Sequence, residues 1–184
     1  MADLLGMSTG VIDGTVSEQD IGPMNRINFQ LSPIRDGVAM VEAFSHCILF
    51  ETDDGLVAFD TSGVNGGARV VEAIRGWRED RFNTLVYTHG HLDHVGGCGA
   101  FMADAESKSS PRPQLVGHEN VPRRFDRYDF TSGYNNVINR RQFGQFSRRG
   151  YDIGDGDRFF REQNPVVQFI DGLHSLARRE GDRS

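Results

Sequence analysis

The chain has 184 residues, of which 38% are hydrophobic and 25% are charged, and its formal net charge at pH 7 is -6. These proportions are typical of one soluble globular domain, and the acidic balance argues against a dedicated nucleic-acid or membrane-surface binder. Two cysteines exclude a disulfide framework, and no stretch approaches the ~20 apolar residues of a membrane span. Residues 1–10 lack the basic start and apolar core of a signal peptide, so we expect a cytoplasmic protein.

The first third of the sequence predicts an N-terminal arm followed by a sheet. Residues 1–25 carry glycines and acidic residues without a clear period, so we expect an arm that is loosely held or packed on the surface of a domain spanning 26–184. Apolar patterning then predicts an antiparallel meander of four strands, with turns at residues 36–37 and 53–55. The strands are expected at residues 26–31, 38–44, 46–50 and 56–59.

A helix and a fifth strand are expected next. Residues 68–77 carry apolar side chains at helical spacing, with Trp77 expected in the core, and residues 82–87 form an apolar strand. Strand, helix and strand in this order imply a crossover into the same sheet, and ligand sites collect at the carboxyl ends of such strands. Asp60, at the end of the fourth strand, either orients a histidine ligand or serves as a cap or turn residue.

A cluster of metal-ligand residue types follows the fifth strand. His89, His91, Asp93 and His94 fall within six residues, and half of the six histidines lie here. Imidazole nitrogen and carboxylate oxygen are the ligands that zinc and similar divalent ions prefer. In an extended segment the first three would point the same way, and His94 would lie where the chain turns into a helix. The spacing predicts that one loop serves two metal ions, the alternative being ordinary polar loop residues.

After residue 94 the sequence signals for helices, strands and site residues are weaker. We expect a short helix to start within residues 97–102, an exposed loop at 103–113 and a short strand at 114–117. His118 either faces the site or is a buried, hydrogen-bonded histidine. Cys98 is either a metal ligand or a small buried core residue.

An arginine-rich segment begins after residue 121. Nine arginines and five aspartates lie between Arg123 and Arg161, interleaved with aromatic residues, whereas the whole chain has a single lysine. The guanidinium fork suits contacts with carboxylate, phosphate or sulfate oxygens. The segment indicates either anion recognition or a solvated face paired with the aspartates, unless it reflects a general arginine bias.

The run from His89 to His94 resembles the HxHxDH motif of the metallo-β-lactamase superfamily of metal-dependent hydrolases. The resemblance implies an α/β (α+β) fold, an αββα sandwich that is either complete or present only as its N-terminal half. It implies that His89 and His91 bind one zinc ion, that Asp93 and His94 bind a second, and that a metal-bound hydroxide is the nucleophile. Asp93 would thereby be catalytic as well as a ligand.

Residues 118–128 and 133–143 resemble the alkyl sulfatase branch of that superfamily, within a likeness that runs from about residue 25 to residue 146. In that branch a tyrosine and an asparagine near this point contact the sulfate group. The matching residues are Tyr134 and Asn136, with Asn135 as the adjacent alternative. The resemblance implies hydrolysis of a small-molecule sulfate ester or another ester, with a homodimer as one option. The acidic balance of the chain predicts no nucleic-acid partner.

The family's later ligands have few counterparts in this sequence. A bridging carboxylate, a late histidine and, in alkyl sulfatases, glutamates are required, and the candidates are Glu162, His174 and Glu180. We therefore expect an incomplete C-terminal end, from a truncated or frameshifted reading frame or a fragment.

Three rival functions remain open. Another hydrolase of the superfamily, such as a thioesterase or a lactonase, would use the same metal loop. A catalytically inactive remnant that acts as an interaction module would need no later ligands. A nucleic-acid-processing enzyme would use the arginine-rich segment on phosphates, although the overall acidity argues against it.

Overall fold

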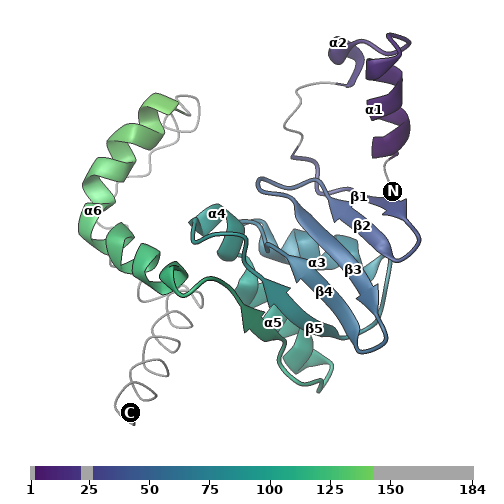
Figure 1. Ribbon diagram of the computed structural model, residues 1–184. Coiled ribbons are helices and arrows are strands. Elements are labelled where there is room, and N and C mark those ends of the chain that lie inside the picture. The colour runs from purple at the N-terminus through teal and green to yellow at the C-terminus, as the bar shows by residue number, and fades with distance from the viewer. Residues whose placement is uncertain (1–2, 22–26, 143–184) are drawn as a thin grey trace. The chain divides into compact units, whose positions relative to one another are not determined.

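The computed structural model describes residues 3–21 and 27–142 (Figure 1), and the chain divides into two compact units between His118 and Glu119. Each unit is described by itself. The first contains five short helices and the sheet, and the second is described through one helix. The domain boundary expected at residue 26 stays a prediction.

Two helices lie in the segment predicted as an arm. α1 spans Leu4–Ile12 and α2 spans Glu18–Ile21. Asp3 caps α1, because its carboxylate accepts a hydrogen bond from the backbone N–H of Gly6 at 2.8 Å. Leu5 and Ile12 remain exposed, so α1 has no consistent apolar face that the sequence pattern could reveal.

Six strands form one mixed sheet in sequence order (Figure 1). Strands β1 to β4 pair antiparallel, which confirms the predicted meander. The chain then crosses through α3 (Gly67–Arg75) to β5, which pairs parallel with both β4 and β6 and confirms the predicted crossover. The strands are β1 Leu31–Arg35, β2 Val38–Val41, β3 Cys47–Thr52, β4 Gly55–Phe59, β5 Phe82–Val86 and β6 Gln114–Val116.

The first strand begins later than predicted. The pattern places it at residues 26–31, whereas β1 begins at Leu31. Phe29 has a φ of 59°, a left-handed conformation that does not continue a strand. The alternating residues before Leu31 therefore form a bend that leads into β1. Pro33 is tolerated inside β1 because this strand lies at the edge of the sheet.

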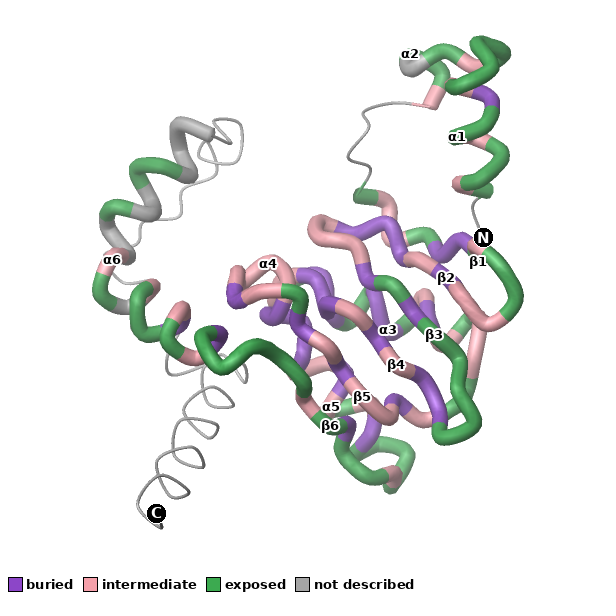
Figure 2. Tube along the Cα trace, in the orientation of Figure 1, coloured by how far each residue is buried: buried purple, intermediate pink, exposed green. Residues whose placement is uncertain are grey.

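Buried and more exposed residues alternate along parts of the strands (Figure 2), so the two faces of the sheet differ in exposure. α3 and α5 (Cys98–Ser107) pack on one face, where the strand side chains are buried. The opposite face carries a cross-strand set of apolar side chains that stay half-exposed or exposed, which we call the apolar row. Its members are Met40, Ile48, Phe50, Phe59, Val86 and Val116. The predicted α/β class is confirmed, with one helical layer and one β layer of the αββα sandwich among the described residues.

An ion pair ties the two covering helices together. The Arg75 guanidinium in α3 donates hydrogen bonds of 2.9 and 2.6 Å to the two carboxylate oxygens of Asp104 in α5, and both side chains are nearly buried. The same guanidinium lies 4.2 Å from the ring centroid of Phe82, which packs on Phe101. Trp77, predicted as a core residue, is instead half-buried, because it follows the end of α3 and lines an open pocket.

α5 is longer than predicted. The sequence predicts an exposed loop over residues 103–113, but α5 continues to Ser107 and only residues 108–113 form the loop. Ala105 is buried and Asp104 is held by Arg75, so tertiary contacts stabilise a turn that the local sequence does not favour. The strand predicted at residues 114–117 is confirmed as β6.

The second unit is described through α6 (Asn120–Gln142), which is kinked at Thr131, where φ is -112° and ψ is 18°. The Thr131 hydroxyl donates to the carbonyl oxygen of Arg127 at 2.8 Å, a contact that commonly bends helices. Within the described ranges, no helix combines the length and apolarity required to cross a membrane.

Candidate metal centre

Residues 88–94, called the metal loop below, leave the carboxyl end of β5. Tyr87 still pairs with β6, through its N–H and the carbonyl oxygen of Val116 at 2.8 Å. His91 is extended and precedes α4 (Leu92–Val95). The ring centroid of His89 lies 4.4 Å from that of His91 and 4.0 Å from that of His94. The three imidazoles of the motif therefore form one cluster.

Asp93 does not alternate with His89 and His91 as the extended pattern predicts. α4 begins at Leu92, so Asp93 and His94 are adjacent residues of one helical turn. The Nε2 atom of His94 lies 3.5 Å from Oδ2 of Asp93. Two ligand atoms on a tetrahedral zinc ion with bonds of ~2.0 Å are about 3.3 Å apart. The separation in this chain is therefore suitable for two ligands of one ion.

Asp60 lies beside the metal loop and binds one of its histidines directly. Its Oδ2 atom is 2.7 Å from Nδ1 of His94, and the carboxylate is 5% exposed. Because a carboxylate only accepts hydrogen bonds, Nδ1 of His94 carries the proton, and a neutral ring then presents an unprotonated Nε2 atom. Of the two roles that the sequence left open, this geometry matches the carboxylate that orients a histidine ligand.

Thr88 extends the same network to a second histidine. Its hydroxyl donates to Oδ2 of Asp60 at 2.6 Å, and its backbone N–H donates to Oδ1 at 2.9 Å. The hydroxyl has a single proton, so its 3.0 Å contact with Nδ1 of His89 makes that nitrogen the donor. A neutral His89 ring then also presents an unprotonated Nε2. One buried carboxylate thus sets the tautomers of two predicted ligands.

Ser45 is a site residue that the sequence did not reveal. It lies between β2 and β3, and its hydroxyl donates to Oδ2 of Asp93 at 2.6 Å. The two residues are 48 positions apart, and a serine in a loop carries no pattern of its own. The neighbouring His46 has a buried Nδ1 atom without a hydrogen-bond partner among the described residues.

Backbone strain gathers around this centre. Five non-glycine residues of the described chain have positive φ, and three of them are Ser45, Asp60 and Ser62, with φ of 60° to 62°. Left-handed conformations cost a non-glycine residue about 1–3 kcal/mol and persist where surrounding contacts hold them. Each of these three side chains makes such a contact: Ser45 with Asp93, Asp60 with His94, and Ser62 with the carbonyl oxygen of Phe44.

The glycines that follow the motif allow the metal loop to lie close to the end of β4. A Cβ atom on Gly97 would lie 2.0 Å from the carbonyl oxygen of Thr61, and one on Gly67 would lie 2.6 Å from Gly97. The N–H of Thr61 donates to the carbonyl oxygen of His94 at 2.7 Å. Glycine is required here because backbone packs directly on backbone.

The donor set fits a divalent ion in its chemistry and in the tautomers of His89 and His94. Within the described residues, no three His, Cys, Asp or Glu side chains are gathered tightly enough to form a ready metal site. The residues that would hold an ion are nonetheless oriented by Asp60, Thr88 and Ser45, which are not themselves metal ligands of the motif.

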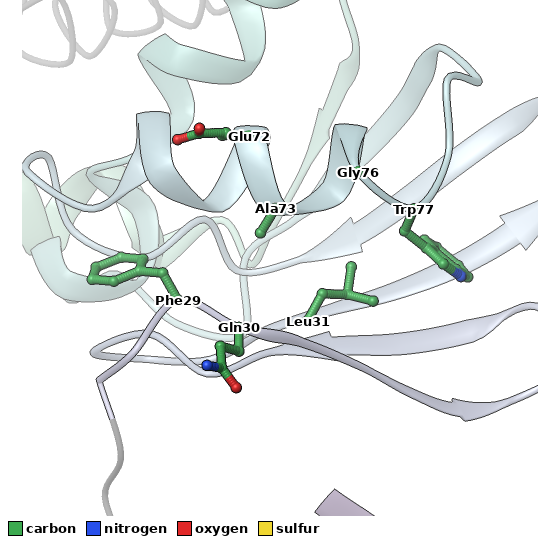
Figure 3. Close-up of a pocket in the computed structure, with 7 residues that line it drawn as sticks. All are labelled: Phe29, Gln30, Leu31, Glu72, Ala73, Gly76 and Trp77. Carbon is green, nitrogen blue, oxygen red and sulfur yellow. The ribbon is translucent and has the colours of Figure 1, made fainter. Parts of the chain in front are cut away.

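The remaining candidates of the first unit fall outside this cluster. Cys98 is buried, and burial raises the pKa of its thiol to about 11. Of the two roles that the sequence left open for Cys98, this matches a core residue and not a metal ligand. His118 is exposed. An open pocket of about 300 Å³ lies beside α3 (Figure 3), and none of its lining residues belongs to the metal loop. They are Phe29, Gln30, Leu31, Glu72, Ala73, Gly76 and Trp77.

The predicted sulfate contacts lie on α6 in the second unit. Tyr134 is 68% exposed, and the side chain of Asn136 lies outside the described residues. The guanidinium carbon of Arg124 lies 5.0 Å from the ring centroid of Tyr128, so at least one arginine of this segment contacts an aromatic side chain. Glu162, His174 and Glu180 also lie outside the described residues.

The sequence model of the metallo-beta-lactamase superfamily matches residues 41–173 of this chain. No curated protein sequence matches it.

Several solved structures resemble part of the chain. The sec-alkylsulfatase Pisa1 from Pseudomonas sp. has 24% identity and a TM-score of 0.38, over 47% of this chain and 14% of the other. The Cronobacter sakazakii metallo-beta-lactamase with a HARLDQ motif has 20% identity and a TM-score of 0.45, over 53% and 37%. BJP-1, a subclass B3 metallo-beta-lactamase of Bradyrhizobium japonicum, has 22% identity and a TM-score of 0.43, over 52% and 35%. The matched region thus spans well under half of each of these chains.

Proposed function

Because the chain belongs to the metallo-beta-lactamase superfamily, we propose that it is a metal-dependent hydrolase whose ligands are His89, His91, Asp93 and His94. The observation that carries this proposal is the contact of the Asp60 carboxylate with Nδ1 of His94 and, through Thr88, with His89. Residues that only shaped a polar loop would not need a buried carboxylate that fixes two histidine tautomers.

In the proposed centre, His89 and His91 hold one zinc ion, and Asp93 and His94 hold a second. When bound, such ions supply Lewis acidity that lowers the pKa of water to about 7. The chain's own part is to fix the Nδ1–H tautomer of the neutral His89 and His94 rings, through Thr88 and Asp60, and to place the Asp93 carboxylate beside His94. Asp93 is the proposed catalytic residue because it matches the aspartate of the HxHxDH motif, and its carboxylate lies beside the proposed ligand His94.

The proposed substrate is a small-molecule sulfate ester of an alkyl chain. Support comes from residues 118–143, where Tyr134 and Asn136 match the sulfate contacts of the alkyl sulfatase branch within an arginine-rich segment. A phenol hydroxyl, a carboxamide and a guanidinium all donate hydrogen bonds, which tetrahedral sulfate oxygens accept.

The second candidate is hydrolysis of a thioester or a lactone. The metal loop favours it equally, because nothing in the donor set of His89, His91, Asp93 and His94 selects sulfur over carbon as the centre attacked.

The decisive assay compares a medium-chain alkyl sulfate with a thioester and a lactone panel, using the full chain with added zinc. Release of inorganic sulfate that is lost in the His89→Ala, His91→Ala double variant supports the sulfatase proposal. Turnover of only the carboxylic substrates would replace it with the second candidate. The matched control is His118→Ala, which removes an exposed histidine outside the metal loop.

A further inference from the structure

The contact between Ser45 and Asp93 joins the β2–β3 connection to the metal loop. The Ser45 hydroxyl donates to Oδ2 of Asp93 at 2.6 Å, a length typical of a hydroxyl bound to an ionised carboxylate. The same Oδ2 atom faces Nε2 of His94 at 3.5 Å. Ser45 therefore contacts the carboxylate oxygen that is nearest the other proposed ligand of the same ion.

The backbone of Ser45 is held in a conformation that serine rarely adopts. Its φ is 62°, in the left-handed region that favours glycine. The preceding residue, Phe44, is held by a hydrogen bond, because the buried Ser62 hydroxyl donates to its carbonyl oxygen at 2.8 Å. A glycine would meet the backbone requirement with less strain, so the serine side chain must supply something that glycine lacks.

We propose that Ser45 is a positioning residue of the metal centre, whose hydroxyl fixes the rotamer and plane of the Asp93 carboxylate. This inference rests on the proposed function, because it requires Asp93 to be a metal ligand. A carboxylate that is already held loses less side-chain freedom when an ion binds, and outer contacts of this kind typically contribute 10- to 100-fold in metal affinity.

The alternative is that Ser45 only fastens the β2–β3 connection to α4 and stabilises the fold. The two roles differ in how zinc affinity and stability respond to substitution. A positioning role links affinity to the hydroxyl, whereas a fastening role links affinity to the stability of the loop.

The test measures zinc affinity of the full chain by competition with a chromogenic chelator, together with the thermal unfolding midpoint of the metal-depleted protein. Ser45→Ala removes the hydroxyl and keeps the strained φ, and Ser45→Gly removes the hydroxyl and relieves the strain. We expect both variants to bind zinc 10- to 100-fold more weakly, to the same extent, although the glycine variant unfolds at the higher temperature. The visible absorption bands of cobalt-loaded protein should change in both, because the geometry around Asp93 changes.

Thr52→Ala is the control for stability alone. The Thr52 hydroxyl donates to the carbonyl oxygen of Gly55 at 2.7 Å, in the turn between β3 and β4 and outside the metal loop, so the unfolding midpoint of this variant should fall while its zinc affinity stays near that of the wild type. Affinities that follow the unfolding midpoints across all three variants would overturn the positioning role. If both Ser45 variants bind zinc as tightly as the wild type does, the positioning role is also overturned, but the metal centre is not. A wild-type chain that binds no zinc would overturn the metal centre itself, and the role of Ser45 with it.

Discussion

The carboxylate of Asp60 lies 2.7 Å from Nδ1 of His94, although 34 residues separate the two in sequence. The contact exists because β4 and β5 are parallel neighbours, so the residues that follow them leave the sheet at the same edge. Asp60 accepts three hydrogen bonds there, one from His94 and two from Thr88. The metal loop is therefore built around a buried carboxylate that is not itself in the motif.

Asp60→Asn is the sharpest test of this arrangement. Asparagine tolerates the positive φ of residue 60, so the backbone is conserved, but the amide cannot accept from all three donors. We expect zinc affinity to fall about 10- to 100-fold, as is typical when a carboxylate that orients a histidine ligand is lost. Chelator competition at pH 7 measures this. An affinity equal to that of wild type would show that Asp60 acts only as a turn residue.

Zinc content should depend on the histidines of the metal loop and not on histidine in general. We expect bound zinc after gentle desalting, at less than two ions per chain because the described residues do not bring three candidate ligands together. The His89→Ala, His91→Ala variant should lose most of it, and His118→Ala should retain it. Equal zinc in all three proteins, measured by elemental analysis, would remove the assignment.

The sequence places the four proposed ligands in one loop because they fall within six residues, and the structure confirms that this loop lies between a strand and a helix. The orientation of Asp93 was predicted wrongly. The prediction assumed an extended chain up to Asp93, whereas α4 already begins at Leu92. The sequence left the role of Asp60 open between two alternatives, since a carboxylate at the end of a strand also serves as a cap or turn residue. Ser45 was not identifiable, because only the fold brings it to Asp93.

The errors in the fold have similar causes. The alternation of apolar and polar residues at 26–31 predicts a strand, but Phe29 has a positive φ and β1 begins only at Leu31. The second half of α5 reads as a loop, but the ion pair between Arg75 and Asp104 stabilises it as a helix. Both outcomes depend on partners more than ten residues away, which a local pattern does not contain.

The apolar row should make the purified chain self-associate. Ile48 and Phe50 are each 39% exposed on the sheet face opposite α3 and α5, and contiguous exposed apolar surface favours association. Replacing both by threonine keeps strand propensity and removes apolar area, so we expect gel filtration to shift towards the monomer with a cooperative thermal transition retained. Leu49→Thr, on the buried face of the same strand, should instead unfold the protein. A wild-type chain that elutes as a sharp monomer would contradict this prediction.

Stability should fall at alkaline pH through the buried thiol of Cys98. Burial raises its pKa from 9.0 to about 11 in the folded state. The folded protein therefore holds the thiol proton more tightly than the unfolded chain, and stability is unaffected below pH 9 and decreases between pH 9 and 11. Each pH unit within that window costs about 1.4 kcal/mol.

Burial also raises the pKa of Cys47 and of Tyr87, so the contribution of Cys98 must be isolated as a difference. Urea unfolding of wild type and Cys98→Ala from pH 8 to 11 provides it, because alanine keeps a small apolar group and has no proton to lose. The gap between the two stabilities should narrow as the pH rises. A gap that is constant with pH would show that the thiol is not protected in the fold.

The proposed hydrolysis of a sulfate ester should depend on the hydroxyl of Tyr134. This side chain is 68% exposed on α6, so its ring contributes little to packing within the second unit, and Tyr134→Phe should leave the unfolding midpoint unchanged. In a desolvated site, losing one hydrogen bond to a charged group costs about 2–4 kcal/mol of transition-state stabilisation, which lowers kcat/KM by roughly 30- to 900-fold.

The measurement is sulfate release from a medium-chain alkyl sulfate with added zinc, for wild type, Tyr134→Phe and Asn136→Ala. The matched control is Tyr128→Phe, because Tyr128 also lies on α6 and its ring is covered by the Arg124 guanidinium, which needs no hydroxyl. We expect the two substitutions at residues 134 and 136 to lower turnover and the control to keep it. Wild-type turnover that survives both would assign Tyr134 and Asn136 to the helix surface, and the arginines of the same segment would then be the next residues to test.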